Sequence, residues 1–318
     1  MCEDYPLYKN FYHFDKQTFQ KLVNKLNPVF IKRIPKKLKY QHTIDKYNGS
    51  YLFIKENWEL NEELNNVTDY FSEHVRINCH FGNNISPCDY WKKYRKHIRD
   101  ESKHRYGKIN EQFMRDTLYN SVKFCNNFRI SIAMTLYNLF NAKIILDPSA
   151  GWGDRLISAI SCKVDKYVGV DPNPNMQPCY QKMIDTLVDG DKKENFTVIE
   201  DGFEYAEIPK LNYDLVFTSP PFFDMEKYSS SSKDSYNAYN NEESWFNDFL
   251  KVLIKKSFDN LIIGGHFVLY ISESSSSHYI NKMIDYTNSL MKYNGSIYYY
   301  YEDVWKPRRI FVWKKIRH

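Results

Sequence analysis

Glycine and proline are scarce in this sequence, with 11 and 12 residues among 318. This composition excludes collagen-like and low-complexity chains, which are rich in one or both residues. Long apolar runs are lacking too, since the longest, Leu261–Ile271, contains two glycines and His266 and is far too short to span a bilayer. The start, Met1–Asp4, is acidic and no apolar stretch follows it, so we expect no secretory signal. We therefore expect an intracellular protein without a membrane partner.

Cysteine pairs of the Cys-x-x-Cys type are also absent from the sequence, although it has six cysteines. Without an export signal, scattered cysteines do not indicate a disulfide framework. His74, Cys79, His80 and Cys88 lie close together in the sequence, but their spacing matches no standard zinc site. We expect a reduced protein with no metal.

Aromatic residues are abundant, with 27 Tyr and 21 Phe making up most of the 17% aromatic content. A disordered chain has few aromatics, so this composition indicates a folded globular protein. The length suits one large domain or two ordinary ones.

Positive charge is concentrated in two segments, although the formal net charge is only +5. Trp91–Lys108 holds eight Lys or Arg residues against Asp100 and Glu101, and Lys306–His318 holds six with no acid. Basic segments with interleaved aromatics suit a nucleic-acid surface, and ordinary solvated helix faces are the alternative. From the first segment we select Lys92, Lys93 and Arg95 as candidate phosphate contacts.

The second half of the chain alternates short apolar runs with longer amphipathic segments. This alternation predicts βαβ units and a parallel sheet. The predicted parallel strands are Lys143–Asp147, Tyr167–Asp171, Phe196–Glu200, Tyr213–Thr218 and His266–Ile271, the last after a turn at Gly264-Gly265. The predicted helices are Asp154–Ser161, Met176–Leu187, Glu242–Asn260 and His278–Lys292. Ser296–Tyr301 and Ile310–Trp313 leave no room for a crossover and should form an antiparallel hairpin. The expected fold is an α/β, doubly wound, seven-stranded, mostly parallel sheet.

The first half is predicted to be mainly helical. Ser86 as N-cap and Pro87 in the first turn predict a helix that carries the basic segment to Arg105. Another helix is expected over Phe128–Phe140. The polar stretch Gly107–Asn110 indicates a domain boundary in this part of the chain. We divide the chain into an N-terminal region, residues 1–120, for substrate recognition, and a catalytic domain, residues 121–318.

Three consecutive strand ends carry residues suited to a small ligand. Asp147–Arg155 is a turn of small residues between a strand and a helix, where the backbone can approach a ligand and free N–H groups can face it. The segment matches neither the GxGxxG motif nor a P-loop with its lysine, so a dinucleotide or a triphosphate is disfavoured as its ligand. The alternative to a ligand site is an ordinary strand-to-helix turn. Asp171 is placed to accept ribose hydroxyls. In Asp201-Gly202-Phe203, the carboxylate and the aromatic ring could bracket an adenine ring.

The fourth strand end reads Thr218-Ser219-Pro220-Pro221-Phe222. An exocyclic amine is a poor nucleophile because its lone pair is delocalised into the ring. Hydrogen bonds from this amine to the Ser219 side chain and the Pro220 carbonyl would localise the lone pair, in a loop stiffened by proline. Phe222 offers a face for the base. For the tetrapeptide alone, a polyproline turn is the alternative.

Together these features resemble class I methyltransferases that use S-adenosylmethionine, over roughly residues 141–315. The tetrapeptide is similar to the Asp/Asn/Ser-Pro-Pro-Tyr/Phe/Trp motif of family members that modify planar nitrogens. The resemblance implies S-adenosylmethionine as the cofactor, held by Asp147, Ser149, Gly151, Gly153, Asp171, Asp201, Gly202 and Phe203. It implies a catalytic motif of Ser219, Pro220, Pro221 and Phe222.

The serine form of the motif looks most like DNA cytosine-N4 methyltransferases, whereas Asp or Asn forms are more usual for adenine-N6, guanine-N2 and glutamine. We expect transfer to a DNA cytosine N4 or adenine N6, with an RNA base, a protein glutamine or a non-catalytic nucleic-acid-binding protein as alternatives. The short interval between Asp147 and Thr218 leaves no room for a target-recognition domain. Recognition of the target nucleotide sequence would then require the N-terminal half, a separate specificity subunit or a homodimer.

The polar, serine-rich segment Phe223–Asn240 directly follows this motif. It predicts a mobile lid over the target pocket, and a flexible surface loop is the alternative. Phe223, Asp224 and Tyr228 are the candidate substrate contacts within it.

Overall fold

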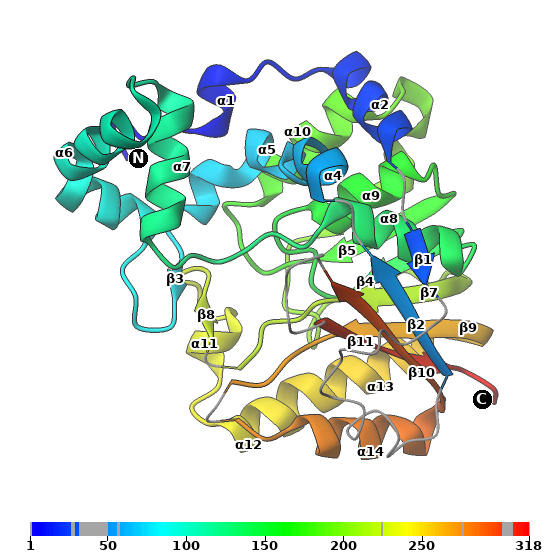
Figure 1. The fold of residues 1–318 in the computed structure, drawn as a ribbon. Helices are drawn as coiled ribbons and strands as arrows, with labels where there is room; N and C mark the ends of the chain where they lie inside the picture. The colour runs from blue at the N-terminus through cyan, green and yellow to red at the C-terminus, as the bar shows by residue number, and fades with distance from the viewer. Residues whose placement is uncertain are drawn as a thin grey trace.

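A computed structural model describes residues 2–26, 29–31, 50–55, 58–223, 225–274, 277–300 and 308–317. Its centre is a nine-stranded sheet in the order β1-β2-β10-β11-β9-β7-β4-β5-β6 (Figure 1). The strands are β1 (Val29–Ile31), β2 (Ser50–Lys55), β4 (Ile144–Asp147), β5 (Lys166–Val170), β6 (Phe196–Ile199), β7 (Tyr213–Thr218), β9 (Leu261–Tyr270), β10 (Lys292–Tyr300) and β11 (Arg308–Lys314).

The doubly wound fold predicted from the sequence is confirmed. Strands β4, β5, β6, β7 and β9 are parallel to their neighbours within this group. The final pair, β10 and β11, forms the expected antiparallel hairpin, and β11 runs antiparallel to β9. Nearly every side chain of β5 and β7 is buried, so neither strand has an exposed polar face, as a sheet covered on both sides requires.

Two strands from the N-terminal region extend the sheet beyond the seven that we expected. β2 lies parallel to β10, with Ser50 opposite Gly295 and Lys55 opposite Tyr300, and β1 pairs antiparallel with β2. The seven-stranded prediction was therefore incomplete, because the first half of the chain contributes to the same sheet.

The expected turn at Gly264-Gly265 was wrong. Both glycines lie inside β9, which begins at Leu261. The pairing of β9 with β7 shifts register between Tyr213 and Leu215, and Gly264 has φ +88°. A Cβ on Gly265 would lie 2.9 Å from the Asp214 carbonyl oxygen, so glycine accommodates an irregularity within the strand instead of ending it.

Helices cover both faces of the sheet (Figure 1). One face carries α8 (Ile130–Leu139), α9 (Asp154–Ser161) and α10 (Gln177–Leu187), and a short 3-10 helix, Gly190–Asn195, follows α10. The other carries α12 (Glu242–Ser244), a π-helical segment (Trp245–Leu250), α13 (Lys251–Asn260) and α14 (Ile280–Leu290). The predicted helix Glu242–Asn260 is thus continuous but contains a π-helical stretch. Two apolar clusters fill the space between the sheet and its two helical layers.

The N-terminal helices lie mostly on the side of α10 (Figure 1). They are α1 (Tyr8–Phe11), α2 (Lys16–Lys25), α4 (Trp58–Asn65), α5 (Val67–Arg76), α6 (Pro87–Tyr106) and α7 (Glu111–Ser121). Short strand β3 (His80–Phe81) connects α5 to α6. No helix among the described residues is long and apolar enough to cross a bilayer.

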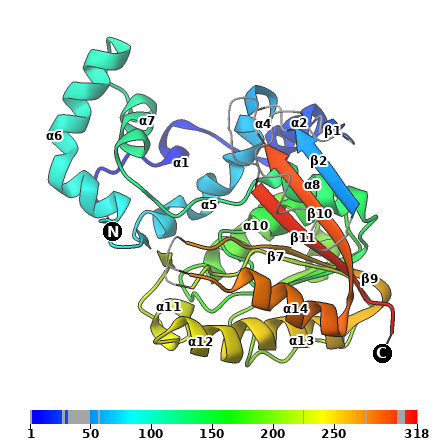
Figure 2. The same cartoon turned by 60° about the horizontal axis from the view of Figure 1, so that its bottom comes forward.

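Helix α6 forms as predicted and packs against α7 (Figure 2). The Ser86 side chain accepts from the Asp89 N–H, Pro87 occupies the first turn, and Gly107 ends the helix with φ +72°. A separate small cluster that includes Trp91, Ile98 and Leu118 fills the space around this helical pair. The division between residues 120 and 121 stays a proposal, and it falls at the end of α7.

Candidate active site

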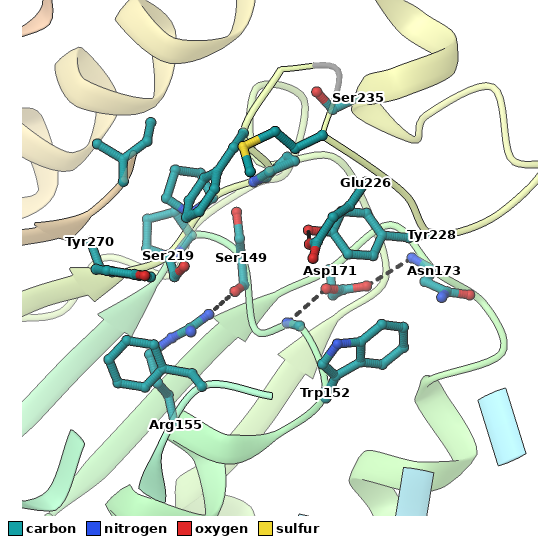
Figure 3. A pocket seen from close by; sticks show the side chains of 18 of the residues that line it. Ser149, Trp152, Arg155, Asp171, Asn173, Ser219, Glu226, Tyr228, Ser235 and Tyr270 are labelled. Carbon is teal, nitrogen blue, oxygen red and sulfur yellow. Dashed lines mark hydrogen bonds between the residues drawn. The ribbon is translucent and has the colours of Figure 1, made fainter. Parts of the chain in front are cut away.

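A cavity of about 680 Å³ opens at the carboxyl ends of the parallel strands (Figure 3). This volume lies within the range of small-molecule pockets, and this end of an open α/β sheet is where ligands bind. The predicted site residues in its lining come from four strand ends and one loop. They are Ser149, Gly151, Asp171, Gly202, Phe203, Ser219, Pro220, Pro221, Phe222 and Tyr228.

The turn after β4 is shaped by its glycines. Gly151 and Gly153 have φ of +61° and +95°, which other residues rarely adopt. Gly151 lines the cavity. Gly153 lies outside the lining, and a Cβ on it would come within 2.5 Å of the Met183 Sδ in α10. The first glycine is therefore placed to meet a ligand, whereas the second is needed for close helix packing.

Asp147 lies behind this turn and is fully buried. Its Oδ2 accepts from the Arg155 Nε at 2.8 Å and from the Tyr167 hydroxyl at 2.7 Å. Arg155 also donates to the Ser149 carbonyl. The carboxylate thus holds the shape of the turn, and the cavity is lined by Ser149 and Arg155 in front of it.

Asp171 faces the cavity from the end of β5. One carboxylate oxygen accepts from the Gly151 N–H at 2.9 Å and the other from the Asn173 N–H at 3.0 Å (Figure 3). Burial raises the pKa of this carboxyl to about 7. Each oxygen keeps a further lone pair for a ligand hydroxyl.

After β6, Gly202 and Phe203 line the cavity, but Asp201 lies outside its lining. The Asp201 carboxylate accepts from the Lys233 Nζ at 2.6 Å. The acid that does line the cavity here is Glu204, which the sequence analysis missed. Its Oε1 accepts from the Tyr239 hydroxyl at 2.8 Å, while its Oε2 is buried with no hydrogen-bond partner among the described residues.

The catalytic-motif candidates Ser219, Pro220, Pro221 and Phe222 line the cavity directly after β7. The Phe222 ring lies 5.7 Å from the Tyr270 ring, between centroids. Phe223 has φ +45° and packs against Trp245, outside the cavity lining. Asp224 lies outside the described residues.

The segment after this motif closes one side of the cavity. β8 (Glu226–Lys227) pairs with β3, and the Gly82 N–H donates to the Met225 carbonyl at 2.7 Å. The Tyr228 ring packs against Trp152 of the glycine turn, 5.8 Å between centroids. Glu226 accepts from the Tyr228 hydroxyl, and burial raises the pKa of Glu226. We refer to residues 225–234 as the strap; α11 (Ser235–Ala238) follows it.

The N-terminal region also supports the glycine turn. The Thr68 hydroxyl of α5 donates to the Asp154 Oδ1 at 2.6 Å, and the Ser72 hydroxyl donates to the Trp152 carbonyl at 3.1 Å. Burial raises the pKa of Asp154 to about 7. No local motif marks Thr68 or Ser72, since their partners lie 80 or more residues away.

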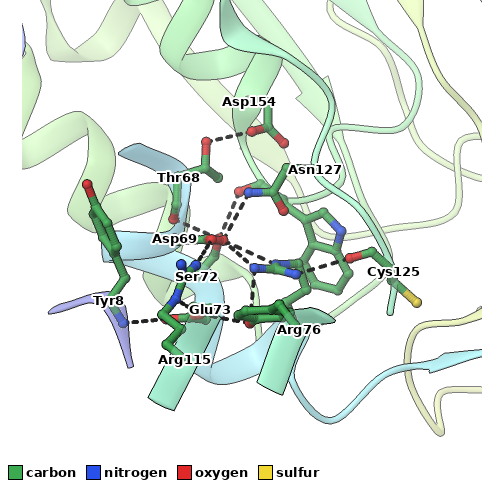
Figure 4. A network of polar contacts seen from close by, with 12 residues as sticks. Tyr8, Thr68, Asp69, Ser72, Glu73, Arg76, Arg115, Cys125, Asn127 and Asp154 are labelled. Carbon is green, nitrogen blue, oxygen red and sulfur yellow. Dashed lines mark hydrogen bonds and ion pairs between the residues drawn. The ribbon is translucent and has the colours of Figure 1, made fainter. Parts of the chain in front are cut away.

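A buried network of charges lies beside the cavity (Figure 4). Asp69 accepts from Arg76 at 2.6 Å and from Arg115 at 2.5 Å, and Arg115 also donates to Glu73 at 2.7 Å. The Asn127 Nδ2 donates to the same Asp69 at 3.0 Å. Asn127 lines the cavity, so this network connects α5 and α7 to its wall.

The candidate phosphate contacts Lys92, Lys93 and Arg95 are exposed on α6, outside the cavity lining. Lys92 pairs with Asp89 at 3.3 Å. The buried side of the helix is the stripe Cys88, Trp91, Ile98 and Ser102, so most of its cations face solvent. Among the described residues no group of three or more His, Cys, Asp or Glu is arranged to hold a metal.

No protein-family model matches the sequence, and no curated protein sequence matches it. Solved structures similar to its fold include TrmN from Thermus thermophilus, with 13% identity, a TM-score of 0.43, and 59% of this chain and 49% of that chain covered. An N-methyltransferase, NodS from Bradyrhizobium japonicum, has 10% identity and a TM-score of 0.39, with 58% and 94% covered. An rRNA methylase from Streptococcus thermophilus has 15% identity and a TM-score of 0.39, with 61% and 99% covered. The chain thus matches about half the length of TrmN, and the likeness concerns the fold alone.

Proposed function

We propose that this protein is an S-adenosylmethionine-dependent methyltransferase that methylates an exocyclic amino nitrogen of a nucleic-acid base, with DNA cytosine N4 or adenine N6 favoured. The observation that carries the proposal is that two sets of residues open into one cavity. Gly151 and Asp171 line it from β4 and β5, and Ser219 to Phe222 line it from β7. A donor and an acceptor of a methyl group can therefore meet there.

The residues on the β4, β5 and β6 side fit a nucleoside cofactor. Asp171 presents carboxylate lone pairs for ribose hydroxyls, and Phe203 offers an apolar surface for adenine. The unpartnered Glu204 Oε2 is an acceptor for an amino group. When bound there, S-adenosylmethionine supplies an electrophilic methyl group.

The β7 side fits the acceptor amine. The Ser219 side chain and the Pro220 carbonyl accept its two N–H bonds, which localises the nitrogen lone pair. Phe222 stacks with the base. No strong base is needed, because the amine loses its proton after the nitrogen has become cationic. A base in a duplex must leave the helical stack to reach this motif.

The exposed cations of α6, including Lys92, Lys93 and Arg95, provide the contact with phosphates in this proposal. In this proposal the target nucleotide sequence is recognised by the N-terminal region, by a specificity subunit or by a second copy of the chain.

Labelled-methyl transfer to DNA and RNA, followed by mass spectrometry of nucleosides and amino acids, tests the proposal. The expected product is N4-methylcytosine or N6-methyladenine in DNA. Label found in an RNA nucleoside or in glutamine would show that RNA or a protein, and not DNA, is the substrate. Calorimetric binding of the cofactor without transfer to any of these would favour a non-enzymatic role, and absence of both would refute the proposal.

A further inference from the structure

The side of the cavity away from the glycine turn is an aromatic wall. Figure 3 shows Tyr270 and Ser219 on one side of the cavity and Asp171 and Trp152 on the other. The Tyr270 ring lies 5.7 Å from Phe222 and 6.1 Å from Tyr299, between centroids. Phe222 and Tyr270 are partly exposed in the cavity lining, so a flat ring bound beside Ser219 can contact both, and the almost fully buried Tyr299 packs beside Tyr270.

A cationic side chain, that of Arg308, lies at this wall. Arg308 is the first residue of β11, lines the cavity and lies opposite Tyr299 in the hairpin register. Its guanidinium carbon is 6.0 Å from the Tyr299 ring centroid, and its Nη1 donates to the Tyr270 hydroxyl at 3.4 Å. The side chain is exposed, so its donors reach the cavity mouth.

The neighbouring Arg309 has a different environment. Its Nε donates to the Ser296 hydroxyl at 2.9 Å, and its Nη2 donates to the Tyr293 hydroxyl at 3.1 Å. Its guanidinium also lies 4.4 Å from the Phe311 ring centroid. Arg309, which also lines the cavity, therefore braces the β10–β11 hairpin, whereas Arg308 is the more exposed of the two.

We propose that Arg308 binds the phosphodiester group next to the target nucleotide while the base of that nucleotide packs against Phe222 and Tyr270. This inference rests on the proposed function and narrows its substrate to a nucleic-acid strand. A planar guanidinium fork matches a phosphate, and an aromatic wall matches a base. One nucleotide supplies both groups, whereas a glutamine side chain has neither a ring nor an anion.

Binding measurements test this role without requiring catalysis. The probe is a fluorescein-labelled single strand of about 15 nucleotides, near the upper limit of common site sizes, as DNA and as RNA. Its Kd is measured across a salt series for the wild type and for Arg308→Gln, Arg308→Lys and Arg317→Gln. Arg317 is a matched control, because it is exposed, donates to the Ser289 carbonyl at 3.3 Å and lies outside the cavity lining.

Arg308→Gln should weaken binding and lower the slope of log Kd against log salt by about 0.7, the value for one phosphate contact on a single strand. Arg308→Lys should keep the slope, since it keeps the charge, and Arg317→Gln should match the wild type. Weaker binding to one strand type alone would identify that strand as the partner. The proposal is overturned if Arg308→Gln behaves as Arg317→Gln on both probes, or if Arg308→Lys loses the slope as the glutamine variant does.

These outcomes are separable from failure of the proposed function. A wild-type protein that binds the strand with the Arg308-dependent slope but transfers no methyl group would refute methyl transfer and leave the phosphate contact standing. Conversely, transfer to nucleic acid with no effect of Arg308→Gln on binding would refute only the role of Arg308.

Discussion

The two sides of the cavity are built from different kinds of sequence. The side that we propose for the cofactor, called the cofactor side below, consists of residues that directly follow β4, β5 and β6, such as Gly151 and Asp171. The other side combines β7 and β11 with segments far away in the chain, including Phe81 beside β8 and Asn127 beside α5. The first side is built on local turns that α5 supports through Thr68 and Ser72, whereas the second takes part of its lining from the N-terminal half itself. Each side should therefore respond to a different class of substitution.

The largest effect should come from removing Asp69, which joins α5 and α7 to Asn127 in the cavity wall. Asp69→Ala leaves Arg76 and Arg115 buried without their shared carboxylate, which should lower the free energy of unfolding by about 3–5 kcal/mol. Denaturant unfolding followed by circular dichroism measures this change.

Asp185→Ala is the control, because its pair with Lys193 is exposed to solvent and should contribute little to the free energy of unfolding. If the two substitutions lowered the free energy of unfolding equally, the buried network would not hold the N-terminal helices in place.

The next effect separates the two sides by function. If Ser219 holds the acceptor amine, Ser219→Ala should lower the rate of methyl transfer about 100-fold, as loss of one preorganised hydrogen bond typically does. Cofactor affinity, measured by calorimetry, should not change, because Ser219 follows β7 and the proposed cofactor residues follow β4 to β6. Ser289→Ala, at an exposed position of α14, is the control. Unchanged transfer in Ser219→Ala would refute the role of this side chain.

Sequence reasoning succeeded where the signal was local. Ser86, Pro87 and Gly107 delimit α6 within one residue of the expected ends, because capping depends on adjacent residues. The glycine turn and the Ser219–Phe222 motif were located because each directly follows an apolar strand. The same reasoning placed the strands that carry them.

Long-range pairings left no such signal. No motif near Thr68 or Ser72 indicates that these residues support the glycine turn. The addition of β1 and β2 to the sheet depends on pairing with β10, which lies far along the chain. The choice between Asp201 and Glu204 was also beyond the sequence, since it depends on which way the turn after β6 directs each carboxylate and on the position of Lys233 in the strap.

That choice gives a smaller, sharper test within the cofactor side. Glu204→Gln should raise the Kd for S-adenosylmethionine about tenfold, since loss of a hydrogen bond to a charged acceptor costs about 1.5 kcal/mol or more. Asp201→Asn should change it about twofold at most, because Asp201 lies outside the cavity lining and its partner Lys233, which does line the cavity, is half exposed. The reverse order would return the adenine-binding role to Asp201.

The smallest effect is a pH dependence of cofactor binding. Burial raises the pKa of Asp171 to about 7, so its carboxyl is mostly protonated at pH 6 and mostly ionised at pH 8. Only the ionised form keeps every lone pair for Gly151, Asn173 and a ribose hydroxyl, so affinity should rise with pH through this window, by less than about tenfold. Calorimetry at several pH values measures this change.

Asp154 is the matched control, because burial raises its pKa to about 7 as well and it also lines the cavity. Its carboxylate is already bound by the Thr68 hydroxyl and supports the turn from the α5 side. Asp171→Asn should therefore flatten the pH profile, whereas Asp154→Asn should leave its slope. If Asp154→Asn flattened the profile instead, the titrating group would belong to the support from the N-terminal region, and the two sides of the cavity would not be independent.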